Sequence, residues 1–220
     1  MKQPRLLDLF CGAGGAGVGY AQAGFDVIGV DITPQPHYPF PFIQADALTF
    51  PLEGYDVVHA SVPCQAFSAA TVKARQNGNV YPDYLALMRE RVKASSSYWI
   101  LENVPGAPMQ HGILLCGSMF GLRVRRHRYF ETSHLLFAPR SCKHTSDFVT
   151  IYGDEVLRQR RNPLYTGLKC GVRSQLVTSF PHEVGQKAMG IEWMNAKELS
   201  QAIPPAYTQW VGQHLQVVLS

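Results

Sequence analysis

The sequence predicts an α/β fold with a Rossmann-like, doubly wound and mostly parallel sheet. Short apolar segments alternate with helical segments over residues 5–131, and they are rich in Val, Ile, Leu and Phe without strict alternation of polar residues. This pattern is typical of central strands that are covered on both faces. A glycine-rich turn follows the first of these segments directly, as in many nucleotide-binding folds.

The predicted elements follow in order along the chain. Strands are expected at 5–10, 26–31, 41–44, 55–60, 97–102, 113–116 and 123–131. Helices are expected at 16–23 and at 81–93, where Pro82-Asp83 is a good helix start. The gap before 123–131 is too short for a crossover helix, so the last strand is expected in an antiparallel edge.

A final helix is expected to begin at Pro204-Pro205 and to pack back on the sheet. Its predicted apolar face consists of Tyr207, Trp210, Val211, Leu215 and Val218. Periodicity is weak between 138 and 183, where the basic residues include Arg158, Arg160, Arg161, Lys169 and Arg173. We therefore expect a catalytic domain from 1–137 and 184–220, with 138–183 as a small loop-rich insert that is either a solvated connector or a nucleic-acid contact surface.

Composition narrows the class of protein only slightly. The chain has 220 residues, a net charge of +4 and a pI of about 8.8, which is compatible with nucleic acid but also with many ordinary enzymes. Its five cysteines are an odd number without a tight framework, which favours reduced thiols in the cytoplasm. No signal peptide and no apolar run long enough to cross a membrane are recognisable, and the oligomeric state is not indicated.

The glycine-rich turn indicates a nucleotide site. Gly12, Gly14 and Gly17 fit the pattern G-x-G-x-x-G between a strand and a helix. Asp31 ends the next strand and can accept hydrogen bonds from ribose hydroxyls. This motif alone fits NAD as well as S-adenosylmethionine, and it also fits a merely structural turn. Asp46 could bind an adenine amino group or cap a helix.

Three further segments come in a fixed order after the string Asp-Leu-Phe-Cys-Gly-Ala-Gly-Gly, which begins at Asp8. They are Val62-Pro63-Cys64-Gln65, Glu102-Asn103-Val104, and a basic run that includes Arg126 and Arg128. Together the four segments resemble the DNA cytosine-5 methyltransferase family, in the form of a compact phage or orphan enzyme. The resemblance covers 5–131 well and 184–215 loosely, and it implies a class I fold that uses S-adenosylmethionine.

The resemblance implies roles for the cofactor-binding residues. Phe10 and the glycine loop contact the methionine part and Asp46 contacts the adenine N6, while Asp31 keeps the ribose role expected from its position at the strand end. The full set expected to bind S-adenosylmethionine is Phe10, Gly12, Ala13, Gly14, Gly15, Asp31, Ile32, Asp46, Ala47 and Pro63.

The resemblance also implies the chemistry of the reacting centre. Cytosine C5 is too weak a nucleophile to accept a methyl group until a thiolate adds to C6, and Cys64 is the candidate for that covalent addition. Glu102 can hydrogen-bond N3 and the N4 amino group, which activates the ring. Of the arginine pair, Arg126 and Arg128, one contacts cytosine O2 and the other supports the catalytic loop.

Duplex DNA is the expected partner, and its target cytosine must be flipped out of the helix. The polar segment 68–80 is expected to form a lid that contacts DNA. The insert at 138–183 then corresponds to a reduced target-recognition region, which favours a short recognition sequence.

Several points stay open. Ser200-Gln201 stands where the family carries Gly-Asn, with Gln201 as a candidate replacement, so the identity of the methyl donor is in doubt. The alternatives are an RNA cytosine-5 methyltransferase, a catalytically silent nucleic-acid-binding relative and an NAD enzyme. No metal site is expected, because Cys142, His144, Cys170 and His182 lack the usual paired zinc spacing.

Overall fold

The computed structural model describes residues 3–95, 97–144, 149, 151 and 182–220, and within them seven strands form one mixed sheet. The strands are β1 (Arg5–Leu9), β2 (Asp26–Asp31), β3 (Phe42–Gln44), β4 (Val57–Ser61), β5 (Tyr98–Asn103), β6 (Gly112–Leu115) and β7 (Arg128–Thr132). Their order is β3-β2-β1-β4-β5-β7-β6, in which the first five are parallel and β7 runs antiparallel to both of its neighbours. The predicted fold class is confirmed.

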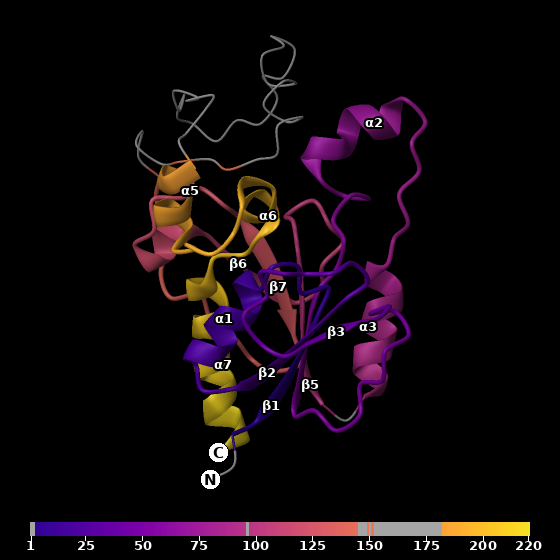
Figure 1. Cartoon of the computed structure of the whole chain (residues 1–220), viewed down its shortest axis with the longest axis vertical. Helices are drawn as coiled ribbons and strands as arrows, with labels where there is room; N and C mark the ends of the chain where they lie inside the picture. The colour runs from indigo at the N-terminus through magenta and orange to yellow at the C-terminus, as the bar shows by residue number, and fades with distance from the viewer. Residues whose placement is uncertain (1–2, 96, 145–148, 150, 152–181) are drawn as a thin grey trace.

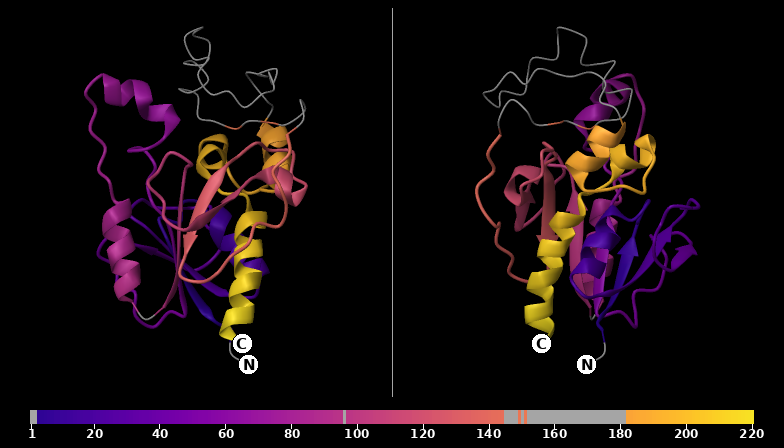
Figure 2. Two further views of the ribbon diagram at one scale, coloured as in Figure 1. Left: turned by 180° about the vertical axis from the view of Figure 1, so that it is seen from behind. Right: turned by 60° about the vertical axis from the view of Figure 1, so that its left-hand side comes forward.

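Helices cover both faces of the sheet (Figures 1 and 2). The described helices are α1 (Gly15–Gln22), α2 (Val72–Gln76), α3 (Leu85–Ala94), α5 (His182–Met189), α6 (Ala196–Gln201) and α7 (Pro205–Leu219), with 3₁₀ turns η1 (Ala69–Thr71) and η2 (Gly117–Phe120). Helices α1 and α7 pack together on one face, and α3 lies on the other. None of the described helices is long and apolar enough to cross a membrane.

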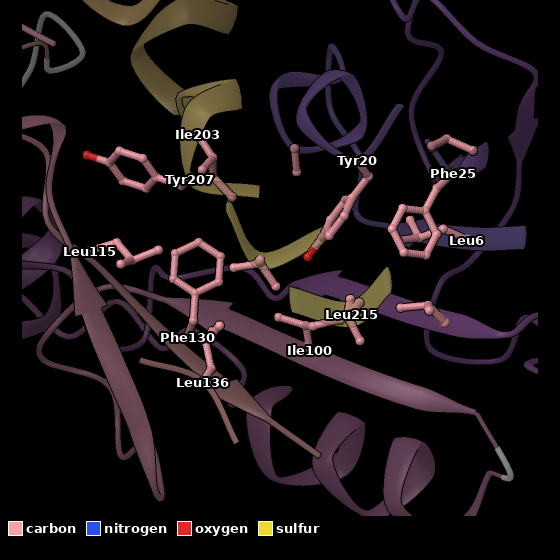
Figure 3. Packing of buried hydrophobic residues seen from close by; sticks show 14 of the residues in the cluster. Leu6, Tyr20, Phe25, Ile100, Leu115, Phe130, Leu136, Ile203, Tyr207 and Leu215 are labelled. Atoms are coloured by element: carbon pink, nitrogen blue, oxygen red, sulfur yellow. The ribbon is translucent and has the colours of Figure 1, made fainter. Parts of the chain in front are cut away.

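Two hydrophobic clusters fill the spaces between these layers. Leu6 and Leu7 are neighbours on β1 and enter opposite clusters, because successive side chains of a strand point to opposite faces. Figure 3 shows the cluster on the α1 and α7 side, where Tyr20 and Tyr207 are fully buried. A Cβ at Gly19 would lie 2.1 Å from the carbonyl oxygen of Pro205, so glycine is required where α1 meets α7.

The structure corrects three element predictions. The strand predicted at 123–131 begins only at Arg128, because Val124 forms an isolated bridge with Val149 instead of joining the sheet. The segment 68–80, where no helix is expected from the sequence, contains η1 and α2. On α7, Tyr207, Val211 and Leu215 are fully buried, but the side chain of Val218 is 44% exposed and does not belong to the packed face.

The antiparallel edge was predicted correctly, although the outermost strand is β6 and β7 lies between it and β5. Most of the region predicted as an insert, 138–183, lies outside the described residues. The basic residues predicted there lie outside them as well: Arg158, Arg160, Arg161, Lys169 and Arg173.

Candidate active site

The residues predicted for the site lie at one edge of the sheet. Asp31 ends β2, Glu102 is the penultimate residue of β5, and Cys64 follows the end of β4. These strands are parallel, so their carboxyl ends meet at the same edge. Arg128 begins the antiparallel β7, and the pairing of Asn103 with Tyr129 brings that beginning to the same edge.

The loop that carries Cys64 is closed by backbone hydrogen bonds. The N–H groups of Phe67 and Ser68 donate to the Cys64 carbonyl oxygen at 2.9 and 2.8 Å. The buried side chain of Asn103 donates from Nδ2 to the Val62 carbonyl oxygen at 3.1 Å. Asn103 therefore fixes the loop that carries Cys64 to β5. We did not assign it from the sequence, although it stands next to Glu102 in the string that supported the resemblance.

Glu102 and the two arginines form a buried charged group. Nε of Arg128 lies 3.0 Å from Oε1 of Glu102, and both side chains are largely buried. The guanidinium of Arg126 donates to the carbonyl oxygens of Ser200 and Ile151, at 2.9 and 3.2 Å. Apart from its ion pair with Arg128, which lacks the direction of a hydrogen bond, Oε1 of Glu102 has no partner among the described residues. Nε of Arg126 has no hydrogen-bond partner among them either.

Burial sets the protonation behaviour of this group. It raises the pKa of Glu102, and this effect outweighs the lowering by Arg128 and Arg126. Burial likewise raises the pKa of the Cys64 thiol, while Arg128 lowers it and Glu102 raises it further. The thiol is therefore mostly protonated at neutral pH in the free protein.

A buried hydrogen-bond chain leads to Glu102 from the core. The hydroxyl of Tyr20 lies 2.9 Å from Nδ1 of His59, and Nε2 of His59 lies 2.9 Å from Oγ of Ser61. Ser61 in turn hydrogen-bonds the carboxyl group of Glu102. Burial lowers the pKa of His59 to about 3, so its imidazole is neutral and can donate from one nitrogen and accept at the other. No sequence pattern indicated this series of hydrogen bonds, because its side chains come from α1, β4 and β5.

The glycine turn adopts the left-handed backbone that its sequence suggests. Phe10, Gly12 and Gly14 have φ angles of 55°, 49° and 86°. The N–H of Gly12 donates to Oδ2 of Asp31 at 3.1 Å, and a Cβ at Gly12 would meet nothing within 4 Å. A Cβ at Gly15, in contrast, would lie 2.4 Å from the Ile203 carbonyl oxygen. Gly12 therefore faces open space beside a carboxylate, whereas Gly15 is needed for packing.

Three other residues predicted to bind the cofactor, Ile32, Asp46 and Ala47, differ in exposure and in hydrogen bonding. Ile32 is 65% exposed directly after Asp31. Oδ1 of the exposed Asp46 accepts from the Leu48 N–H at 2.9 Å, so this carboxylate caps the turn that follows it. Ala47 is buried in the core, and its carbonyl oxygen accepts from Arg91 at 2.8 Å. The structure thus brings Ile32 to the surface of the site and turns the Ala47 side chain away from it.

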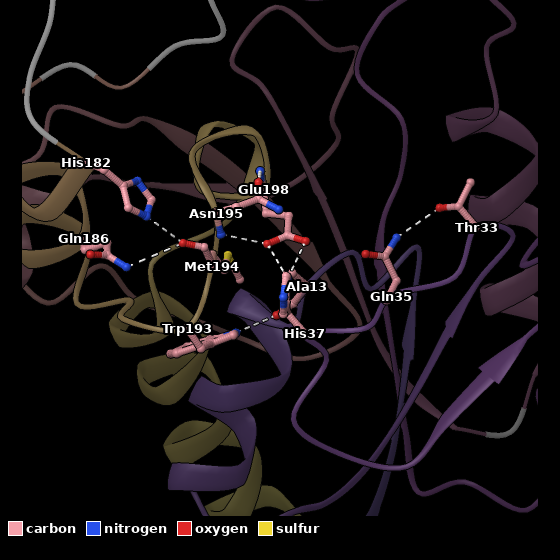
Figure 4. Close-up of polar contacts among 10 residues, drawn as sticks. All are labelled: Ala13, Thr33, Gln35, His37, His182, Gln186, Trp193, Met194, Asn195 and Glu198. Atoms are coloured by element: carbon pink, nitrogen blue, oxygen red, sulfur yellow. Dashed lines mark hydrogen bonds and ion pairs between the residues drawn. The ribbon is translucent and has the colours of Figure 1, made fainter.

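The segment before α7 holds the glycine turn in place (Figure 4). The indole N–H of Trp193 donates to the Ala13 carbonyl oxygen at 2.8 Å. Nδ1 of His37, in the loop after β2, lies 2.9 Å from the carboxylate of Glu198, which also completes a capping box with Asn195. Gln201, the candidate replacement for the family's Asn, is exposed at the end of α6.

Asp8 lies beneath this turn and is completely buried in β1. The hydroxyl of Tyr38 donates to its Oδ2 at 3.1 Å, whereas Oδ1 has no partner among the described residues. Burial raises the pKa of Asp8 to about 8. The carboxyl group is therefore mostly protonated at neutral pH.

Comparison with solved structures supports the fold over the whole chain. A protein of E. coli assigned as a DNA modification methyltransferase encoded within a prophage has a TM-score of 0.64 at 16% identity, and the similarity covers 99% of each chain. A mutant of DNMT2 from Spodoptera frugiperda has a TM-score of 0.62 at 12% identity, covering 99% of this chain and 100% of that one. The Dnmt2 methyltransferase of S. pombe has a TM-score of 0.60 at 14% identity, covering 100% of both. At these identities the likeness concerns the fold alone.

Sequence comparison identifies the family. No curated protein matches the chain significantly. Residues 4–111 match the sequence model of the family described as C-5 cytosine-specific DNA methylase, and this range includes the glycine turn, Cys64 and Glu102. The match shows that residues 4–111 form a C-5 cytosine-specific DNA methylase domain and that the chain is an enzyme of that family.

Proposed function

We propose that this chain transfers a methyl group from S-adenosylmethionine to C5 of a cytosine flipped out of duplex DNA, through a covalent bond between Cys64 and C6. The observation that carries the proposal is the grouping of Cys64 with Glu102 and Arg128 at one edge of the sheet. Two buried polar atoms there lack a directed hydrogen bond among the described residues: Nε of Arg126, and Oε1 of Glu102 apart from its ion pair with Arg128. A polar ring with both donors and acceptors, such as cytosine, would satisfy them.

Each residue of the group has a defined task in this proposal. The thiolate of Cys64 forms the bond to C6, and the displaced electron pair is accommodated at N3, which takes a proton from Glu102. The raised pKa of Glu102 favours the protonated form that this step requires. C5 thereby becomes nucleophilic and accepts the methyl group. The N3 proton returns to Glu102 as the methyl group is transferred. Loss of the C5 proton to solvent then expels the Cys64 thiolate and restores the aromatic ring.

The thiolate must form when substrate binds, because the pKa of Cys64 is raised in the free protein. Arg128 and Arg126 both favour the thiolate electrostatically. We also assign them to the polar edge of the base. Asn103 keeps the loop at the distance set by β5 through its bond to Val62. These contacts support the proposed assignment of Arg126 and Arg128 to the reacting centre.

The residues around the glycine turn fit the proposed cofactor. S-adenosylmethionine supplies an activated methyl group. Gly12 has a left-handed backbone next to open space, and Asp31 lies within hydrogen-bond distance of its N–H. We assign Asp31 to the ribose hydroxyls and the exposed Ile32 to the adenine face. Asp46 keeps a second carboxylate oxygen for the adenine amino group. Ala47 could take part only through its backbone N–H.

Duplex DNA is the proposed substrate, in a prokaryotic or phage-infected cell. In the segment 68–80, Lys73 is exposed and available to phosphate. Arg75, in contrast, is engaged within its own segment, where its guanidinium donates to the carbonyl oxygens of Gln65 and Ser68 at 2.9 and 3.1 Å. We therefore propose that Lys73 contacts DNA and that Arg75 stabilises the fold of the lid, residues 68–80. The insert at 138–183 remains the proposed target-recognition region.

Product analysis tests the proposal directly. The protein is incubated with S-adenosylmethionine and mixed-sequence duplex DNA, and the DNA is digested to nucleosides for mass spectrometry. We expect 5-methylcytosine with the wild type and none with Cys64→Ala. A parallel reaction with RNA decides between the two nucleic acids. Turnover by the Cys64→Ala variant, or product from RNA alone, would contradict the proposal.

A trapping experiment tests the covalent step. In a duplex that contains 5-fluorocytosine, C5 carries no proton to lose, so the bond between enzyme and base cannot break after methyl transfer. We expect the intact mass of the wild type to increase by that of the DNA strand plus one methyl group. Peptide mapping should place the adduct on Cys64, and an adduct on another cysteine would refute the assignment.

A further inference from the structure

A group of sulfur and nitrogen ligands includes His127, which stands between Arg126 and Arg128 in the chain. Its members are Cys116, His127, Cys142 and His144. We call these four residues the cysteine–histidine cluster. Their ligand atoms all lie within 4.8 Å of one another. From the sequence, the spacing of Cys142, His144, Cys170 and His182 predicts no metal site, and Cys116 and His127 did not enter that prediction.

The backbone explains why sequence spacing did not reveal the cluster. Leu115 at the end of β6 pairs with Arg128 at the start of β7, so Cys116 and His127 extend from two paired strands. Cys142 and His144 are separated by one residue, which in extended chain places two side chains on the same side. Cys170 lies outside the described residues, and Nε2 of His182 is bonded to the Met194 carbonyl oxygen at 2.8 Å.

The distances within the cluster are close to those of a tetrahedral metal site. Nε2 of His144 lies 3.2 Å from Sγ of Cys116 and 2.9 Å from Sγ of Cys142. Nε2 of His127 lies 3.4 Å from Sγ of Cys142. Zinc bonds of about 2.0–2.3 Å to nitrogen and sulfur require ligand atoms that are about 3.5 Å apart in a tetrahedron. Small side-chain movements would therefore suffice for metal binding.

The surroundings favour a fixed site. Cys116 is fully buried, and the other three residues are partly buried. The two imidazole rings are perpendicular, with centroids 5.0 Å apart. Ser118 of η2 donates to Sγ of Cys142 at 3.4 Å and accepts from the Lys143 N–H at 3.2 Å, which anchors the Cys142-Lys143-His144 segment.

We propose that the cysteine–histidine cluster binds one zinc ion as a structural site. Two thiolates and two imidazoles in tetrahedral arrangement are the ligand set that zinc prefers, and four protein ligands leave no open position for catalysis. Each thiol that binds the metal releases its proton to solvent.

The site has a further consequence that rests on the proposed function. His127 stands between Arg126 and Arg128, and in extended chain its side chain points away from theirs. The metal would therefore hold the arginine-bearing segment from the side opposite the substrate. It would also tie that segment to residues 142–144, where the chain enters the proposed target-recognition region.

Metal analysis of the purified full chain tests the proposal. After dialysis against metal-free buffer, we expect about one zinc ion per chain by elemental mass spectrometry. Replacement by Co²⁺ should give the visible absorption of tetrahedral cobalt together with thiolate charge-transfer bands. Cys142→Ser and His144→Gln should lose most of the bound metal. Cys64→Ala and His111→Asn are matched controls that should retain it, since neither residue belongs to the cluster and His111 is exposed.

Wild-type protein without zinc, without cobalt–thiolate absorption and with a thermal midpoint unchanged by added Zn²⁺ would overturn the proposal. So would a disulfide between Cys116 and Cys142 in the purified protein. These measurements are independent of methyl transfer. Zinc-loaded protein that makes no 5-methylcytosine would support the metal site and refute the proposed function. Purified protein that makes 5-methylcytosine but contains no zinc would support the proposed function and refute the metal site.

Discussion

The most quantitative prediction concerns Asp8, whose buried carboxyl group should make the stability of the protein depend on pH. Its pKa is raised from 3.8 to about 8, chiefly by burial. The folded protein therefore favours protonated Asp8 across the neutral range, whereas the unfolded chain releases the proton above about pH 4. The stability that Asp8 contributes is complete below its unfolded pKa and is lost as pH rises toward its folded pKa.

The magnitude follows from the difference in bound protons. Between the two pKa values the folded state holds one more proton at this site, so the free energy of unfolding falls by about 1.4 kcal/mol per pH unit. From about pH 5.5 to about pH 7.0, which lies well inside this window, Asp8 should lower stability by about 2 kcal/mol. Asp8→Asn removes the titration with little change of shape, because Oδ1 has no partner to lose.

Urea unfolding of the wild type and the Asp8→Asn variant at both pH values measures this difference. Subtracting the free energy of unfolding of the wild type from that of the variant at each pH cancels the titration of all other groups, provided that unfolding is two-state. From about pH 5.5 to about pH 7.0, the free energy of unfolding of the Asp8→Asn variant should rise by about 2 kcal/mol relative to that of the wild type. Asp26→Asn is the matched control, since Asp26 is exposed at the start of β2. If the free energies of unfolding of Asp8→Asn and wild type change equally between the two pH values, Asp8 is ionised in the folded protein and its predicted titration is wrong.

The remaining predictions concern the proposed site. Glu102→Gln should lower the methyl-transfer rate by roughly 10²–10⁴-fold, with S-adenosylmethionine affinity unchanged in a calorimetric titration; a rate near that of wild type would exclude Glu102 as the proton donor. Asn103→Ala should destabilise the protein by about 1–3 kcal/mol in urea unfolding, because the buried Val62 carbonyl oxygen loses its donor, whereas the exposed Asn79→Ala should have little effect. Asp31→Ala should weaken S-adenosylmethionine binding at least about tenfold through lost hydrogen bonds to a charged acceptor, and unchanged affinity would refute the ribose assignment.

The sequence was informative wherever function or fold depends on local pattern. The apolar segments predicted every strand except β7 to within two residues, because a central strand must be apolar on both faces. The glycine turn was recognisable because only glycine adopts its left-handed backbone without strain, and Gly12 and Gly14 do so. The strings around Cys64 and Glu102 indicated the family, which the sequence comparison confirmed. The individual roles assigned to these residues stay predictions.

Tertiary structure decided what depends on contacts between distant segments. It showed that Gly15 is required by the Ile203 backbone and that Ala47 belongs to the core, neither of which follows from local pattern. It also brought together Cys116 and Cys142, which are 26 positions apart in the sequence. Local sequence determines which backbone shapes a segment can adopt, but sheet register and helix packing determine which side chains meet. The strands and the glycine turn could therefore be predicted from the sequence alone, whereas the cysteine–histidine cluster could not.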